Sequence, residues 1–168
     1  MVLEEYLFHY YYIDLSRDFN PKLPKEYKFV DGIDITNQSS RSLCCHLGFH
    51  PDDEPNTQPS TGFNMENAPM FNPKLEIMTQ DKDGSLSSFC VVWYDEKLKI
   101  GMFEPVCTRV NYRKKGLGKQ MIIEGLRRLK ESGAEKAYVE SFGENRRRFY
   151  NKVGFITYDK DYPWRKEF

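Results

Sequence analysis

The stretch "EPVCTRVNYRKKGLGKQM" occupies residues 104–121 and places two glycines one residue apart, directly after three basic side chains. An apolar, β-branched run precedes the glycines, and a run of good helix formers follows them. At a strand–turn–helix junction, the first main-chain N–H groups of the helix point outward, and together with the helix dipole they attract an anion. The stretch therefore predicts an anion-binding turn.

The surroundings of this turn are strongly basic, although the chain as a whole is not. Residues 109–130 contain eight Lys and Arg side chains and one acidic residue, Glu124. The whole chain has 25 basic and 25 acidic residues, so its formal net charge is zero. Attraction for an anion, including a polyanion such as a nucleic acid, must therefore come from this local patch and not from the charge of the whole chain.

Two common phosphate-binding motifs do not match the turn. A P-loop needs Ser or Thr after Lys119, where the chain has Gln120, and a glycine five residues before Gly118, where it has Arg113. A dinucleotide-binding fingerprint needs a third glycine where the chain has Met121.

The composition predicts one globular domain that is soluble and cytoplasmic. The chain has 168 residues, of which 39% are hydrophobic and 30% charged. We expect no membrane association, because no apolar run approaches the ~18 residues of a membrane span. Two of the four cysteines are adjacent and the other two lie in predicted strands, which is not a disulfide framework.

Hydrophobic periodicity and turn residues predict a mixed α/β fold. We expect strands at 26–30, 74–80, 85–94, 98–108, 136–141 and 155–160, and helices at 37–49, 116–132 and 145–153. Residues 50–64, rich in Pro, Ser, Thr and Asn, predict a long loop. The strand–helix–strand unit from 98 to 141 should be a right-handed crossover, which makes its two strands parallel.

The N-terminal segment stands apart in composition. Residues 1–24 contain the aromatic run "EEYLFHYYYIDL", followed by "NPKLPK" with two prolines. This segment is either an extension packed on the domain as a strand or helix, or the remnant of an upstream domain. Residues 25–168 are predicted to form the domain itself.

A second motif, "FYNKVGF" at 149–155, follows the glycine turn with one predicted strand between them. With these two motifs, the sequence resembles the GCN5-related N-acetyltransferase (GNAT) superfamily over roughly residues 26–160. The resemblance implies a mixed, mostly antiparallel central sheet of six to seven strands flanked by helices. It also implies that the sheet is splayed between its parallel pair of strands.

The resemblance implies acetyl-CoA as co-substrate and assigns residues to it. The main chain of Val106, Cys107 and Thr108 would pair with the pantetheine arm. The pyrophosphate would lie on the turn, whose cradle is Arg113, Lys114, Lys115, Gly116, Leu117, Gly118 and Lys119. Asn145 would be a further contact, although Arg146 stands where the family often has a small residue.

The implied activity is direct transfer of acetyl from the CoA thioester to a primary amine in a ternary complex. Tyr150 stands at the family's tyrosine position and would act as general acid toward the leaving thiolate. Glu104 would act as general base on the acceptor side of the thioester, where it would accept the amine proton through water. Its side chain should share a face with Val106 and Thr108 unless a bulge intervenes.

Other interpretations of these residues stay open. Tyr150 could instead be an aromatic residue of the core. Glu104 could instead form a salt bridge with Arg109. The stretch "CCHLGFH" at 44–50 suggests zinc, but no second cysteine pair supports it, and we expect no metal. The arginines at 146–148 suggest nucleic-acid binding, but one short cluster favours a solvated face, and we expect no nucleic-acid partner.

The main alternative function is a non-catalytic GNAT-fold domain that binds CoA or a partner protein. The expected partners of the enzyme are acetyl-CoA and an amine acceptor, with the chain a monomer or homodimer. The acceptor is not named by any motif, since residues 37–71, which the resemblance places around it, contain the long loop.

Overall fold

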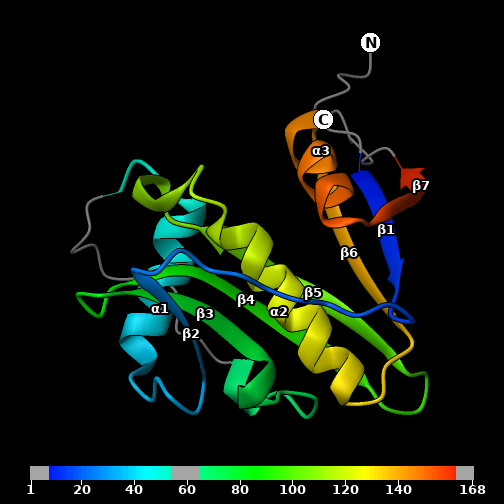
Figure 1. Cartoon of the computed structure of the whole chain (residues 1–168), viewed down its shortest axis with the longest axis horizontal. Coiled ribbons are helices and arrows are strands. Elements are labelled where there is room, and N and C mark those ends of the chain that lie inside the picture. The colour runs from blue at the N-terminus through cyan, green and yellow to red at the C-terminus, as the bar shows by residue number, and fades with distance from the viewer. Residues whose placement is uncertain (1–7, 54–64, 162–168) are drawn as a thin grey trace, which may run out of the picture.

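The computed structural model describes residues 8–53 and 65–161, in which seven strands form one mixed sheet (Figure 1). The strand order is β2-β3-β4-β5-β6-β1-β7. The strands are β1 (Phe8–Asp14), β2 (Tyr27–Asp31), β3 (Glu76–Asp81), β4 (Leu86–Asp95), β5 (Ile100–Thr108), β6 (Lys136–Phe142) and β7 (Ile156–Asp161). The α-helices are α1 (Gln38–Phe49), α2 (Leu117–Glu131) and α3 (Glu144–Val153). All pairs are antiparallel except β5 with β6, so the predicted fold class is confirmed.

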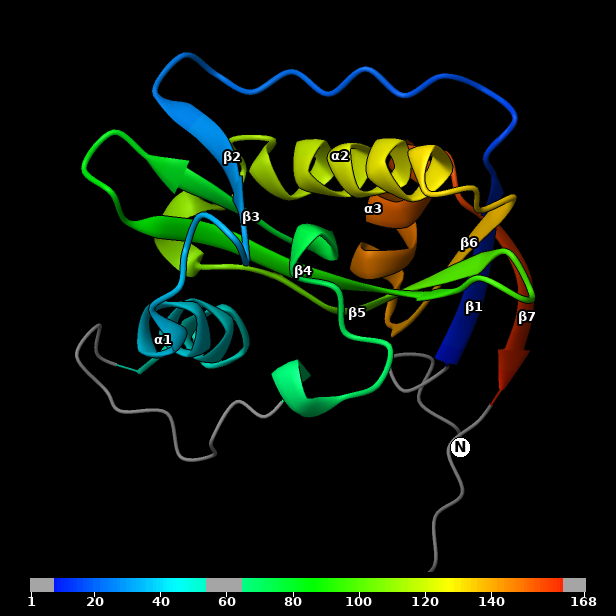
Figure 2. The same cartoon turned by 90° about the horizontal axis from the view of Figure 1, so that it is seen from below.

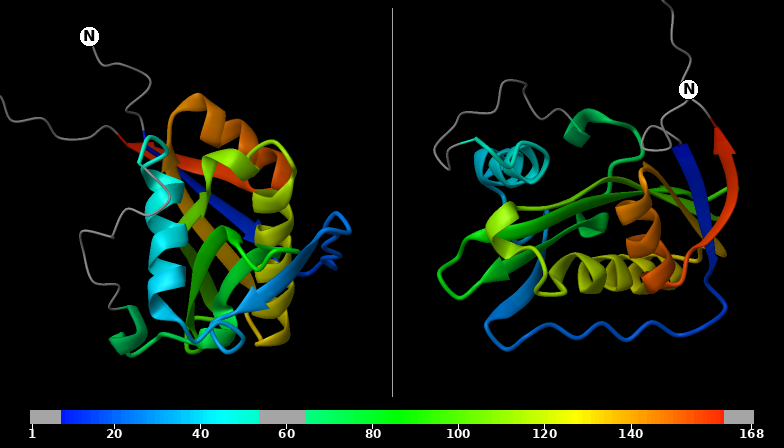
Figure 3. Two further views of the ribbon diagram at one scale, coloured as in Figure 1. Left: turned by 90° about the vertical axis from the view of Figure 1, so that its left-hand side faces the viewer. Right: turned by 90° about the horizontal axis from the view of Figure 1, so that it is seen from above.

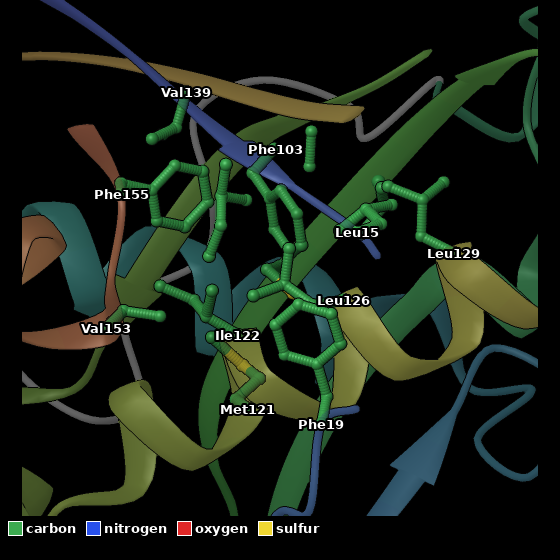
Figure 4. Packing of buried hydrophobic residues seen from close by; sticks show 14 of the residues in the cluster. Leu15, Phe19, Phe103, Met121, Ile122, Leu126, Leu129, Val139, Val153 and Phe155 are labelled. Atoms are coloured by element: carbon green, nitrogen blue, oxygen red, sulfur yellow. The ribbon is translucent and has the colours of Figure 1, made fainter. Parts of the chain in front are cut away.

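The helices lie on opposite faces of the sheet, with α1 on one face and α2 and α3 on the other (Figures 2 and 3). The larger hydrophobic cluster lies under α2 and α3, and Figure 4 shows Phe103 of β5 among Ile122, Leu126 and Phe155. A smaller cluster, which includes Cys44, Phe89 and Cys107, lies under α1.

Helix α2 follows the prediction for residues 116–132 closely. Gly116 precedes it in a left-handed conformation with φ of 80°. Leu117, Met121, Ile122, Leu126 and Leu129 recur at helical spacing, and all are at most 1% exposed. Gly133 follows the helix with φ of 97°, as expected for a glycine that ends one.

Strand β1 lies inside the sheet. It pairs antiparallel with β6 on one side and β7 on the other. Residues 15–26 then run beside α2 to reach β2 (Figure 2), and Lys22 N donates to Gln120 Oε1 at 2.7 Å. The larger hydrophobic cluster includes Tyr11 and Ile13 of β1, and Leu15 and Phe19 of the segment that follows β1. The division into 1–24 and 25–168 stays a prediction.

The parallel pair of strands separates after a short contact. Strands β5 and β6 pair only at Ile100 with Lys136, Gly101 with Ala137, and Met102 with Tyr138. β5 continues to Thr108 and β6 to Phe142, without further pairing between them. The expected splay is therefore confirmed, and it opens toward the end of β5 that precedes the glycine turn.

A bulge in β5, the exception named in the sequence analysis, puts Glu104 on a different face from Val106 and Thr108. The register with β4 shifts between Cys90, which pairs with Val106, and Val92, which pairs with Phe103. Phe103 and Val106 both pack on the cluster under α2, so the side-chain alternation restarts after Pro105. Glu104, next to Phe103, is exposed and belongs to the opposite face, the one that α1 partly covers.

Two further segments differ from the prediction or lie outside the described residues. The predicted strand at 74–80 begins instead with a 3-10 turn, Pro73–Leu75, because Pro73 and the Asn72 cap favour a helical turn. Of the predicted loop at 50–64, residues 54–64 are outside the described range. No helix in the described residues is long and apolar enough to cross a membrane.

Candidate functional site

The glycine turn joins the open end of β5 to α2. After β5, a 3-10 turn (η4, Val110–Tyr112) leads to Lys114 with φ of 64° and Gly116 with φ of 80°. A Cβ on Gly116 would meet nothing within 4 Å, so the left-handed backbone, not lack of space, favours glycine there. The first N–H groups of α2 have no partner within the helix, and no acidic residue lies in its first turn. The turn thus offers main-chain donors to an anion.

Arg113 holds the turn in place with its side chain. Its Nε donates to Thr108 O and its Nη2 to Gly48 O, both at 2.9 Å. The guanidinium thereby ties the end of α1 to the end of β5. Arg113 was predicted in the pyrophosphate cradle, and in this conformation it contributes positive charge there while its donors serve the main chain.

The other basic residues of the turn divide into anchored and available groups. Lys115 Nζ lies 5.3 Å from the ring centre of Tyr112 and 3.3 Å from Tyr27 Oη, and Tyr112 donates to Asp81 Oδ2 at 2.7 Å. Among the described residues, Lys114 and Lys119 have no hydrogen-bond or ion-pair partner. These two ammonium groups are the side chains most available to a bound phosphate.

The start of α2 packs tightly against the other predicted elements of the site. A Cβ on Gly118 would stand 2.9 Å from Thr108 Oγ1 and 3.7 Å from Phe149 Cζ. Glycine therefore lets α2 approach both the end of β5 and α3. The structure brings together Thr108, Gly118 and Phe149, the residue that precedes Tyr150.

Tyr150 is 6% exposed and lies in an aromatic cluster. Its ring centre is 5.4 Å from that of Tyr11, 5.2 Å from Phe149 and 5.9 Å from Phe155. A tyrosine hydroxyl is already protonated at neutral pH, and burial raises the pKa of Tyr150 further above its ordinary value. A protonated hydroxyl is what a general acid requires.

The N-terminal turn of α3 is occupied by its own ion pairs. Arg147 and Arg148 both bind Glu144, at 2.6 and 3.0 Å, and Arg146 lies 4.3 Å from the ring centre of Phe142. Asn145 is exposed on this turn. Its predicted contact with the cofactor stays a prediction.

Glu104 has an exposed carboxylate on a fixed main chain. Its carbonyl oxygen accepts a hydrogen bond from Trp93 Nε1 at 2.7 Å. Arg109, the alternative salt-bridge partner, instead donates to Leu86 O at 3.0 Å and lies over the Tyr112 ring. Glu140 lies two residues beyond Tyr138 on β6, as Glu104 lies two residues beyond Met102 on β5, in the part where the strands are no longer paired. Glu140 has no role in the sequence-based predictions, because only the pairing of β5 with β6 relates the two carboxylates.

The two histidines of the "CCHLGFH" segment contact each other, and His46 also contacts Asp53. His46 Nε2 lies 2.6 Å from Asp53 Oδ2, and the His46 and His50 rings stack with centres 4.5 Å apart. The described residues contain no group of three or more potential metal ligands.

Comparisons with known proteins agree with this geometry. The sequence model of the acetyltransferase (GNAT) family matches residues 41–155, and the chain belongs to this family. A comparison with curated proteins gives no match.

Several solved structures share the fold. The GCN5-related N-acetyltransferase from Sphaerobacter thermophilus superposes with a TM-score of 0.79 at 16% identity, over 95% of this chain and 50% of that one. A tandem GNAT protein from the clavulanic acid biosynthesis pathway gives 0.69 at 12% identity, over 95% and 52%. The GCN5-related N-acetyltransferase from Kribbella flavida gives 0.60 at 13% identity, over 90% and 55%. The chain spans about half the length of these structures.

Proposed function

We propose that this chain is an acetyl-CoA-dependent N-acetyltransferase that transfers acetyl directly to a primary amine. The observation that carries the proposal is the early end of the β5–β6 pairing at Met102 and Tyr138. It leaves one side of the following β5 main chain without a strand partner. That open side leads directly into a helix N-terminus with main-chain donors.

These main-chain groups match two parts of acetyl-CoA, the pantetheine arm and the pyrophosphate. The amides of a pantetheine arm need main-chain partners, which residues 106–108 of β5 offer on the side facing the splay. A pyrophosphate needs N–H donors and positive charge, which residues 113–119 offer, with Lys114 and Lys119 as the available side chains. Acetyl-CoA supplies an acetyl group activated as a thioester, and the remaining requirement is proton transfer.

Tyr150 is the proposed general acid. As the bond between the acetyl carbon and sulfur breaks, the leaving thiolate needs a proton, and the Tyr150 hydroxyl is protonated at neutral pH. The tyrosine belongs to the same short helix whose Phe149 faces Gly118, so it lies beside the start of α2.

Glu104 is the proposed general base. A primary amine with a pKa of about 10.4 is an ammonium at neutral pH and must lose a proton before it attacks. The carboxylate of Glu104 is exposed on the α1 face, and Glu140 is exposed on β6, across the splay from β5. We propose that a water molecule carries the proton of the amine to Glu104. The negative charge of Glu140 would attract the ammonium group of the acceptor.

Acetyl-CoA binding and turnover test the proposal together. We expect acetyl-CoA to raise the melting temperature and free CoA thiol to appear with at least one member of an amine panel. No thermal shift at millimolar acetyl-CoA would overturn the proposal. Binding without turnover across the panel would favour the alternative, a non-catalytic CoA-binding or protein-interaction domain.

Substitutions then assign the proton transfers. Tyr150→Phe should lower kcat by about a hundredfold and leave acetyl-CoA binding unchanged, because only the acidic hydroxyl is lost. Glu104→Gln should lower kcat by a similar factor, of about a hundred, because the group that accepts the amine proton is lost. Glu140→Gln is the matched control on β6 and should mainly raise KM for a cationic amine. Unchanged kcat in Tyr150→Phe would refute its role as acid.

A further inference from the structure

Two cysteines from distant parts of the chain meet where α1 crosses β5. The Cys107 thiol, buried under α1, lies 3.7 Å from Cys45 O and 4.0 Å from Cys44 O. The side chains of Cys45 and Cys107 are close enough for each thiol to shift the pKa of the other. A Cβ on Gly48 would overlap the Cys107 side chain, so glycine lets α1 lie this close to β5.

The four cysteines have different chemical environments. Cys45 is half-buried, and the hydrogen bond from Cys107 lowers its pKa below the ordinary value for a thiol. Burial raises the pKa of Cys44 and of Cys90 to about 12. The hydrogen bond to Cys45, together with burial, raises the pKa of Cys107. A partly accessible, more acidic thiol beside a second thiol is the arrangement of a peroxide-sensitive pair.

We propose that Cys45 and Cys107 form a reversible disulfide when the protein meets a hydroperoxide. The Cys45 thiolate attacks the peroxide, so that an S–O bond forms, the O–O bond breaks, and the leaving oxygen takes up a proton. Cys107 sulfur then attacks the sulfenic sulfur, an S–S bond forms, and the S–O oxygen leaves as water with the Cys107 proton. Two thiols are oxidised and one peroxide is reduced, and a thiol reductant reverses the change.

The disulfide would act on the site through the β5 main chain, a consequence that rests on the proposed function. An S–S bond of about 2 Å is much shorter than a contact between two thiols, so α1 at Cys45 and β5 at Cys107 must move relative to each other. Cys107 lies in the middle of the segment proposed to pair with the pantetheine arm. Because a shift of about 1 Å in a binding element can cost up to a hundredfold in rate, we expect oxidation to lower kcat/KM by about tenfold or more.

Peptide mapping of the full chain tests the disulfide without reference to activity. After treatment with hydrogen peroxide and alkylation of free thiols, mass spectrometry should find one peptide pair joined through Cys45 and Cys107, lost again with dithiothreitol. Cys44→Ala, the matched control with the neighbouring buried thiol removed, should give the same cross-link, and Cys45→Ser should give none. A sulfinic acid on Cys45 without a cross-link, a cross-link through Cys44, or no oxidation would overturn the proposal.

Titration of the oxidised and the reduced protein with acetyl-CoA tests whether the disulfide changes acetyl-CoA binding, separately from whether the disulfide forms. Weaker binding in the oxidised wild type, with peroxide-insensitive binding in Cys45→Ser, is the expected result. Equal binding in both redox states would overturn the regulatory effect. If the cross-link forms but neither state binds acetyl-CoA, the proposed function fails while the disulfide stands.

Discussion

Strands β2, β3, β4 and β5 pair with their neighbours in chain order, whereas β6 and β7 are separated by β1, which precedes all of them in the chain. In the first half of the sheet, short turns join β3 to β4 and β4 to β5, while β2 reaches β3 through the segment that contains α1. The second half requires a segment from more than a hundred residues away in the sequence. The splay lies between these two halves, so one wall of the proposed cofactor site is local in sequence and the other is not.

The largest expected effect tests how strongly the stability of the second half of the sheet depends on β1. Tyr11→Ala should lower the free energy of unfolding by about 4 kcal/mol, because it removes a fully buried ring that packs on Tyr150. Urea denaturation measures the change. Tyr12→Ala, on the opposite face of the same strand, should cost only about 1 kcal/mol, since its ring meets Tyr138 and Tyr158 on a more open surface. Equal costs for the two would contradict the described packing of β1.

The next effect concerns the first half, where α2 is tied to the edge strand β2. Arg128 binds Glu124 and Asp31, each at 2.6 Å, and donates to Lys74 O at 2.8 Å. Arg128→Met should lower the free energy of unfolding by about 3 kcal/mol, because it leaves two partly buried carboxylates with less compensation.

The control for this substitution is Arg148→Met, whose side chain is 68% exposed in its pair with Glu144. It should change the same free energy by about 0.5 kcal/mol or less. A cost for Arg148→Met as large as that for Arg128→Met would show that burial does not separate the two ion pairs.

The smallest expected effect is a pH dependence at α3. Hydrogen bonds from Arg147 lower the pKa of Glu144 to about 2, below its ordinary value of 4.5. Its contribution to stability is therefore present above the ordinary value and is lost as pH falls from 4.5 toward about 2. Melting temperatures across this range should fall less steeply for Glu144→Gln than for the wild type. Parallel curves for the two proteins would argue against this ion pair in solution.

The same contrast between local and distant pairing explains what could be predicted. The hairpins from β3 to β5 and the α2 helix follow from turn residues and from apolar spacing within a few residues, and both are confirmed. The place of β1 could not be predicted, because "FHYYYID" is equally compatible with an edge strand or a separate element. Its pairing depends on β6 and β7, which no local pattern relates to it.

The orientation of Glu104 depended on whether β5 has a bulge, which the sequence left open. Pro105 is a signal for one, because a proline inside a strand is found at bulges or edges. The bulge at this point moves the carboxylate to the α1 face, toward the proposed acceptor side. Arg113 shows a similar limit, since its charge could be read from the sequence but its two main-chain acceptors depend on how α1 meets β5.

The position of β1 has a consequence for how the protein forms during synthesis. Its aromatic strand is made before any other described element, yet both of its pairing partners are made last. As the chain emerges from the ribosome, β2 to β5 and α2 can assemble while β1 still exposes Tyr10, Tyr11 and Tyr12 without strand partners. The sheet is completed only when β7 has been released, so among the described strands β1 is the one that waits longest for its partners and would be open longest to a chaperone that holds apolar segments.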